Sequence, residues 1–212
     1  MEIISHRGFW VEPSEKNKIE AFERSFSIGF GTETDIRDRD EELVIAHDVA
    51  NRSDITFEEF CGTYKKYSCE KSLALNIKSD GLALKLKQVL LKYKIENYFL
   101  FDMSAPNLRA SISVGLKCFT RISDAESYPI FYESCAGVWM DGFYSDWYTY
   151  DDIYKPINDG KKVCLVSSEL HNRDNKTLWE FLKSTGLHCE SQLILCTDHP
   201  DDASSFFQGE IA

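Results

Sequence analysis

The hydrophobic positions of this chain fall into short runs that alternate with longer amphipathic segments. Short apolar runs of four to six residues are typical of buried β-strands, and apolar residues at a spacing of three or four are typical of helices. Eight runs predict strands, at residues 2–5, 31–35, 73–78, 98–101, 116–120, 137–141, 162–166 and 192–196. Helices are predicted at residues 19–28, 56–67, 84–93, from 104 onward, and at 149–158, 177–185 and 200–208.

The alternation of strands and helices predicts an α/β fold with parallel strands and right-handed crossovers. Eight such units that close on themselves form a compact (βα)8 TIM barrel, and 212 residues form one domain, 1–212, of that kind. The fifth unit is the weakest, because Pro129 interrupts residues 124–132. A doubly wound open sheet is the alternative, but the chain has neither of the usual nucleotide-binding glycine motifs.

The stretch of residues 31–48, GTETDIRDRDEELVIAHD, contains the densest candidate chemistry. If its first part is a strand, Glu33 and Asp35 point to the same face, because side chains two apart in a strand share a side. Two adjacent carboxylates repel each other unless a cation lies between them, and an oxygen-liganded divalent ion is the usual solution. The stretch ends in His47, and a second histidine, His6, follows the first predicted strand.

In a (βα)8 barrel the carboxyl ends of all strands meet at one mouth, where active sites lie. We therefore expect the polar residues at the predicted strand ends to converge there. These residues are His6, Glu33, Asp35, Asn76, Lys78, Asp102, Asp141, Glu169, Thr197 and Asp198.

The charge of the chain excludes some classes of partner. A formal net charge of −11 argues against nucleic-acid binding and against a basic membrane-binding surface. An anionic substrate requires local positive charge, which a metal ion, Arg7 or Lys78 would supply. No apolar run is long enough to span a membrane, and no secretory leader is visible, so we expect a cytoplasmic protein without stable membrane insertion.

Seven cysteines form an odd set without a C-x-x-C pair, and several lie within apolar runs. This pattern predicts reduced, mostly buried thiols rather than disulfides or a zinc site.

Five motifs together resemble the glycerophosphodiester phosphodiesterase family, which belongs to the superfamily of phosphatidylinositol-specific phospholipase C-like phosphodiesterases. They are H-R-G at His6, E-x-D at Glu33, H-D at His47, L-N-I-K at 75–78 and T-D-H-P at 197–200, in the order and on the strands typical of that family. The similarity extends from residue 4 to about residue 203.

The resemblance implies a (βα)8 barrel and hydrolysis of a small phosphodiester. It implies that Glu33 and Asp35, with Asn76 as a third ligand, hold one divalent cation, Mg²⁺ or Ca²⁺. It also implies that His6 and His47 act as general acid and base, and that Arg7 and Lys78 bind phosphate oxygens. Two histidines suit these tasks because an imidazole titrates near neutral pH.

The chain departs from the family at Asn76, where the family carries a glutamate that is commonly a metal ligand. An amide oxygen can ligate either ion but carries no charge, so Asp141 and Glu169 are alternative sources of a carboxylate. The 48–72 region is short, and the seventh strand ends in VSSEL instead of an aromatic motif. Phosphodiester chemistry is therefore better supported than glycerophosphodiester specificity.

Trp139 and the aromatic residues 143–148 either line a substrate pocket or pack beneath the loops. His171, His188 and His199 lie in predicted loops and are expected at the surface, and Asp198 is expected to be a structural hydrogen-bond partner. Two functions remain open besides hydrolysis: a catalytically weak barrel that binds a phosphorylated ligand, and a lyase that stops at a cyclic phosphate.

Overall fold

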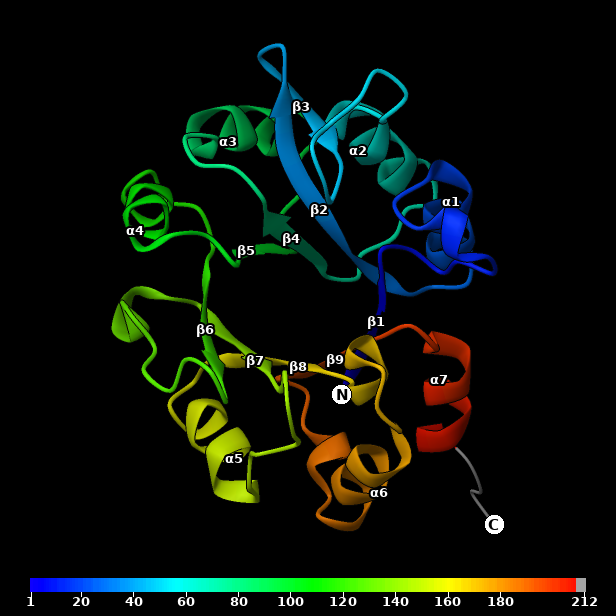
Figure 1. Ribbon diagram of the computed structural model, residues 1–212, viewed down its shortest axis with the longest axis vertical. Helices are drawn as coiled ribbons and strands as arrows, with labels where there is room; N and C mark the ends of the chain where they lie inside the picture. Colours follow the sequence, from blue (N-terminus) through cyan, green and yellow to red (C-terminus); the bar gives the residue numbers. More distant parts are fainter. Residues whose placement is uncertain (209–212) are drawn as a thin grey trace.

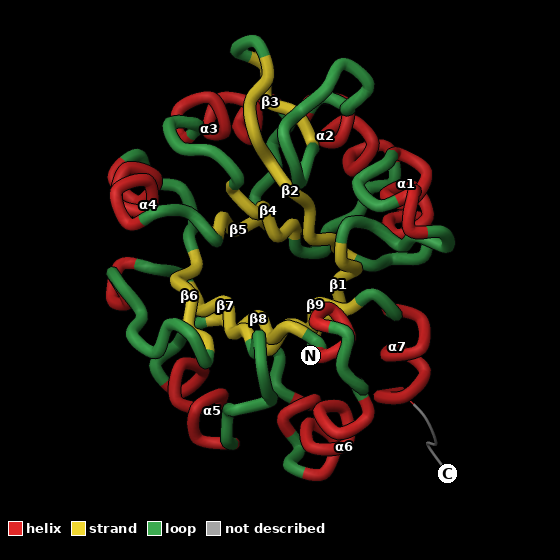
Figure 2. Tube along the Cα trace, in the orientation of Figure 1, coloured by secondary structure: helices red, strands yellow, loops and turns green. Residues whose placement is uncertain are grey.

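The computed structural model describes residues 1–208, and its centre is a ring of eight parallel strands surrounded by helices (Figure 1, Figure 2). The order of neighbours in the sheet is β5-β4-β2-β1-β9-β8-β7-β6. The strands are β1 Glu2–His6, β2 Gly31–Arg39, β4 Leu73–Ile77, β5 Tyr98–Phe101, β6 Phe119–Ser123, β7 Gly137–Asp141, β8 Lys162–Val166 and β9 Leu193–Thr197. The predicted (βα)8 barrel is therefore confirmed.

The ring closes between β5 and β6 through one isolated bridge. Leu100 pairs with Cys118 in parallel orientation, and the Leu100 N–H donates to the Lys117 carbonyl oxygen at 2.9 Å. Every other neighbouring pair in the ring forms a continuous parallel ladder. The junction between β5 and β6 is thus the thinnest part of the barrel wall.

Side chains alternate between the barrel interior and the layer beneath the helices, as strand geometry requires. The interior is packed with aromatic and aliphatic groups, including a Phe101–Trp139 stack with ring centroids 3.7 Å apart. It is formed by Ile4, Ala74, Phe99, Phe101, Phe119, Trp139, Cys164, Val166, Ile194 and Cys196. Two larger clusters fill the outer layer, one beneath the first four helices and one beneath the last three.

Seven α-helices surround the ring in residues 1–208, at α1 Ile19–Ser27, α2 Phe57–Lys66, α3 Ala83–Lys92, α4 Ala105–Ser113, α5 Tyr150–Asn158, α6 Lys176–Ser184 and α7 Pro200–Gln208. The helix predicted from residue 56 begins there, because Thr56 is the N-cap of α2 and forms a reciprocal capping box with Glu59. Ser104 caps α4 in the same way, by accepting from the Asn107 N–H. Local side-chain chemistry therefore defines where these helices begin.

The second strand is longer than predicted and pairs with a further strand. β2 continues to Arg39, and β3, Glu42–Ile45, folds back on it in antiparallel orientation. The turn between them places Asp40 and Glu41 at φ values of 49° and 68°, the left-handed pair that a tight hairpin requires. β2 and β3 therefore form a hairpin, which rises beyond the ring in Figure 1.

The sixth strand in the sequence lies three residues later than predicted, at Phe119–Ser123 instead of 116–120. Leu116 and Cys118 are apolar because they pack in the outer cluster before the strand begins. The end of β6 contains Arg121, which is charged and only partly buried. The sequence there therefore lacks the apolar run that is typical of a buried strand.

The crossover from β6 to β7 has no α-helix. A loop containing Pro129 and one short 3-10 turn, η2 at Tyr132–Ser134, connects the two strands instead. This is the unit that the sequence marked as weakest, and Pro129 explains it because proline cannot donate a helical backbone hydrogen bond. The outer face of β6 and β7 is therefore covered by a loop.

Residues 1–208 contain all seven cysteines, and every one of them is a free thiol. Five are buried, Cys69 is half-buried and Cys189 is exposed. No helix in the described part of the chain is long and apolar enough to cross a membrane.

Gly137 tests how tightly the barrel interior is packed. A Cβ at this position would lie 2.5 Å from the Phe119 ring and against the Lys162 carbonyl oxygen. We expect Gly137→Ala to lower the free energy of unfolding by about 1–3 kcal/mol, because neither the ring nor the strand can move freely. Urea unfolding measures this change.

Gly62→Ala, within helix α2, is the matched control. Its Cβ would contact only the Tyr93 ring, at 3.9 Å. Alanine is the better helix former, so this variant should be more stable by about 0.5–1 kcal/mol. A Gly137→Ala variant as stable as the parent chain would contradict the packing described here.

Candidate active site

Six of the polar residues predicted from the sequence gather at one side of the barrel mouth. They lie at the carboxyl ends of β1 and β4 and in the first five residues of β2, which run beside those ends: His6, Arg7, Glu33, Asp35, Asn76 and Lys78. In the sheet His6 is paired with Glu33, and Asp35 is paired with Asn76. Paired residues of parallel strands point to the same face, so the strand register brings these side chains together.

His6 is held by a carboxylate from the far end of the chain. Its Nδ1 lies 2.7 Å from Asp198 Oδ1, and Trp10 Nε1 donates to the same oxygen at 3.3 Å. Since a carboxylate accepts, Nδ1 carries the proton in the neutral ring and Nε2 is left as the acceptor. Nε2 lies 3.8 Å from Glu33 Oε2, within the cluster.

Burial and hydrogen bonding act in opposite directions on this pair. Burial lowers the pKa of His6, because the charged ring loses solvation, and the contact with Asp198 offsets only part of this effect. Burial also tends to raise the pKa of Asp198, but the hydrogen bond from His6 and the nearby Lys16 hold it below its usual value. The pair is thus a neutral imidazole oriented by an ionised carboxylate.

The two carboxylates of β2 are buried, with 2% of Glu33 and none of Asp35 exposed. Arg7 Nε lies 3.0 Å from Asp35 Oδ2, Asn17 Nδ2 donates to the same oxygen at 2.8 Å, and Lys78 Nζ lies 3.3 Å from Oδ1. Burial and the charge of Asp35 raise the pKa of Glu33 to about 8. Asp35 is therefore neutralised by neighbouring cations, whereas Glu33 lacks an equivalent partner.

Three buried oxygens in the cluster have no hydrogen-bond partner: Glu33 Oε2, Asp35 Oδ1 and Asn76 Oδ1. Leaving such atoms unsatisfied is unfavourable, and a hard divalent cation prefers this kind of oxygen ligand. The donor set therefore fits Mg²⁺ or Ca²⁺. Within residues 1–208 no group of three or more His, Cys, Asp or Glu side chains is arranged to hold a metal, so the set depends on Asn76.

Lys78 connects this cluster to a line of charges along the adjoining wall, at the ends of β5 and β6. Its ammonium also lies 3.7 Å from Asp102 Oδ2, and Asp102 is paired with Arg121. Arg121 Nε in turn donates to Glu126 at 2.7 Å. Asp102, predicted at the mouth, thus serves there as a partner for two cations.

His47 lies on the rim of the mouth, beyond β3. The Ala46 N–H donates to the Asp35 carbonyl oxygen at 3.1 Å, which fixes the backbone next to the carboxylate pair. The imidazole is 46% exposed and its partner is Asp48, at 2.9 Å. His47 and Arg7 line the same hollow of about 200 Å³, so His47 is near the cluster but less rigidly held than His6.

Trp139 lies deeper than a typical substrate contact. It is 4% exposed, stacks on Phe101 within the barrel and donates from Nε1 to Asp141 Oδ2 at 3.4 Å. It therefore forms the floor below the mouth, and its contact with substrate stays a prediction. Of the other aromatic residues in this region, Tyr148 is buried beneath the loops.

The alternative carboxylates, Asp141 and Glu169, have other partners. Asp141 Oδ1 lies 2.7 Å from His171 Nε2, and Glu169 accepts from the Asp198 N–H at 3.0 Å and from Thr197. Glu169 thus supports the Asp198 loop beneath His6.

His171 is not the surface residue that the sequence predicted. It lies in η3, Ser168–His171, directly after β8, and its side chain is only 24% exposed. The rule that places functional residues after barrel strands identified Glu169, and it would also have identified His171, two residues later. His188 is also half-buried, against Phe207, so only His199 of the three is at the surface.

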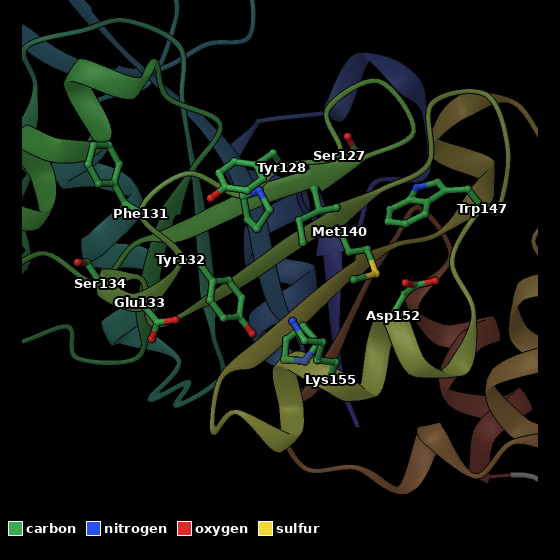
Figure 3. Close-up of a pocket in the computed structure, with 13 residues that line it drawn as sticks. Ser127, Tyr128, Phe131, Tyr132, Glu133, Ser134, Met140, Trp147, Asp152 and Lys155 are labelled. Carbon is green, nitrogen blue, oxygen red and sulfur yellow. The ribbon is translucent and has the colours of Figure 1, made fainter.

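A separate hollow lies outside the barrel wall, at the crossover without a helix. It has a volume of about 560 Å³, with Tyr128 and Tyr132 on one side, Trp147 and Asp152 on the other, and Met140 between them (Figure 3). None of the residues predicted for catalysis, phosphate binding or metal binding lines it, although Trp147, one of the aromatic residues considered for a substrate pocket, does. We therefore do not assign the candidate chemistry to this hollow.

Comparison with known proteins supports the fold. The chain matches no protein-family model, and no curated protein sequence shows a significant match. Among solved structures, a glycerophosphodiester phosphodiesterase from Agrobacterium tumefaciens is 12% identical with a TM-score of 0.68, and the match covers 99% of this chain and 100% of that chain.

Two further structures are 13% identical with TM-scores of 0.69. One is an Oleispira antarctica phosphodiesterase in complex with its product sn-glycerol-3-phosphate, for which the match covers 99% of this chain and 97% of the other. The other is a Parabacteroides distasonis glycerophosphoryl diester phosphodiesterase, with 100% of this chain and 88% of the other covered. The likeness agrees with the family resemblance of the sequence motifs, and the chain has the barrel fold of the glycerophosphodiester phosphodiesterases.

Proposed function

We propose that this protein is a metal-dependent phosphodiesterase that hydrolyses a glycerophosphodiester-like or glycan-linked phosphodiester. One observation carries the proposal: the Asp198-oriented imidazole of His6 lies 3.8 Å from the buried carboxylate of Glu33, beside the cations that contact Asp35. A phosphodiester needs this combination of proton transfer and positive charge around phosphorus. The product bound to the Oleispira antarctica phosphodiesterase is a phosphate ester of the same class.

Glu33, Asp35 and Asn76 would hold the divalent cation, Mg²⁺ or Ca²⁺, through the three buried oxygens that form no hydrogen bond. The bound ion would neutralise charge on the phosphoryl oxygens in the transition state. Arg7 and Lys78 already lie against Asp35, and they would orient the remaining phosphate oxygens.

Proton transfer would use both predicted histidines. His6 presents Nε2 to the cluster, because Asp198 occupies Nδ1. His47, on the rim of the adjoining hollow, would move the second proton on the other side of phosphorus. Trp139 would form the floor beneath the substrate.

A second function, binding of a phosphorylated ligand without turnover, is favoured by the charge balance at Asp35. Arg7 and Lys78 neutralise this carboxylate without a metal, and Asn76 adds no charge. A lyase that releases a cyclic phosphate would use the same residues.

Turnover assays distinguish these functions. We expect hydrolysis of glycerophosphodiesters with Mg²⁺ or Ca²⁺, loss of activity in EDTA, and a rate lowered about 10²–10⁴-fold in His6→Ala, because a positioned proton-transfer group contributes that much. Glu33→Ala should abolish the metal-dependent turnover, because it removes a metal ligand. The control is His188→Ala, a histidine at the opposite end of the barrel.

Each alternative has its own outcome in these assays. If calorimetry shows that a phosphate ester binds, but no metal supports turnover, the protein is a phosphate-ester-binding protein and not an enzyme. Phosphorus NMR of the product would identify a cyclic phosphate, and therefore a lyase.

The role of Asn76 can be measured without turnover. We expect Asn76→Glu to tighten Mg²⁺ or Ca²⁺ binding about tenfold or more, because a third carboxylate adds charge to the site. Asn76→Leu removes the third oxygen and should weaken binding. Calorimetry with the metal alone measures both, and unchanged affinity in both variants would show that residue 76 is not a ligand.

A further inference from the structure

A second pair of histidine and carboxylate lies at the barrel mouth, on β7 and β8. Asp141 ends β7, and His171 lies in the turn after β8. His171 Nε2 is 2.7 Å from Asp141 Oδ1, and Trp139 Nε1 donates to the other oxygen of Asp141 at 3.4 Å. Only 10% of the Asp141 side chain is exposed, so the carboxylate is fixed from both sides.

The pair has the same construction as the one at His6. In both, a largely buried aspartate orients an imidazole and also accepts a hydrogen bond from a tryptophan N–H. The free nitrogen differs, however. Asp198 contacts Nδ1 of His6, whereas Asp141 contacts Nε2 of His171, so neutral His171 has Nδ1 as its acceptor. Within residues 1–208 this Nδ1 has no hydrogen-bond partner.

The neighbours of His171 limit what it can bind. Both oxygens of Asp141 have partners, and neither is an unpartnered oxygen of the kind found at Glu33 and Asp35, so the pair is not equipped for a metal. Phe143 packs edge-on against the ring at 5.2 Å between centroids, and fixes its plane. Arg121 is held by Asp102 and Glu126 on the same side of the mouth.

This wall of the mouth is therefore polar, and its charged side chains are already hydrogen-bonded or ion-paired to one another. Such a surface does not favour an apolar group, but it favours an uncharged group that offers hydrogen bonds. An alcohol hydroxyl is the substrate group that can donate to a neutral imidazole nitrogen.

We propose that His171, oriented by Asp141, binds a hydroxyl group of the substrate alcohol at Nδ1, and so selects phosphodiesters of polyhydroxylated alcohols such as glycerol or a sugar. The inference rests on the proposed phosphodiesterase function, and it names a residue that lies outside the motifs that suggested that function. Asp141 is a positioning residue, because it acts through His171.

Two substitutions at His171 distinguish the roles of its two ring nitrogens. His171→Gln keeps an N–H near the position of Nε2 for Asp141 but removes the acceptor at Nδ1. His171→Asn places an amide oxygen near Nδ1 but gives up the contact with Asp141. The substrates are a glycerophosphodiester and bis(p-nitrophenyl) phosphate, which has no hydroxyl group.

We expect His171→Gln to raise KM for the glycerophosphodiester about 3- to 10-fold with little change in kcat, which corresponds to the loss of one hydrogen bond. KM for the aryl diester should stay within about twofold, and His171→Asn should recover most of the loss. His188→Gln is the control, because the His188 side chain contacts the Leu182 carbonyl oxygen, away from the mouth. This variant should change KM for neither substrate.

The proposal is overturned if KM rises equally for both substrates, if neither KM changes, or if kcat falls and KM does not. If the parent chain hydrolyses the aryl diester but not the glycerophosphodiester, the role of His171 is also overturned, whereas the phosphodiesterase function is retained. A parent chain that cleaves neither substrate would refute the proposed function itself, and with it the role of His171.

Discussion

The candidate site depends on two carboxyl groups held inside the barrel end. Glu33 and Asp35 are almost completely buried, and ionised carboxylates are costly to bury unless they are paired or coordinate a cation. Arg7, from the end of β1, and Lys78, from the end of β4, are placed by neighbouring strands so that both reach Asp35. The parallel register of three strands therefore determines the electrostatics of the site, and the cations already present leave Glu33 as the carboxylate still without an equivalent partner.

Much of this arrangement follows from local sequence rules. The E-x-D spacing predicts that Glu33 and Asp35 share a face, since strand side chains alternate, and both are buried at the mouth. Likewise, the Thr56 and Glu59 pair predicts the start of α2, because a capping box involves only four consecutive residues. These predictions succeed because each depends on interactions within one element.

The features that the sequence did not predict depend on contacts between distant segments. The importance of His171 comes from Asp141, which is thirty residues away and on another strand. The longer β2 is stabilised by its antiparallel pairing with β3, and residues 37–39 at its end are too polar to indicate a strand by themselves. The late start of β6 has a similar cause. Leu116 and Cys118 pack in the outer cluster before the strand begins, so their apolar character did not mark the strand itself.

The single bridge between β5 and β6 leaves the closure of the ring to side chains at that point. One outer cluster joins β2, β4 and β5 to the first four helices, and the other joins β7, β8 and β9 to the last three. Ladders between β1 and its neighbours connect the two halves on the opposite side. Leu100 and Cys118 both belong to the first cluster, and Phe99 of β5 stacks on Phe119 of β6 with ring centroids 3.8 Å apart. Side-chain packing across the junction, rather than a backbone ladder, therefore keeps the wall closed beside the mouth.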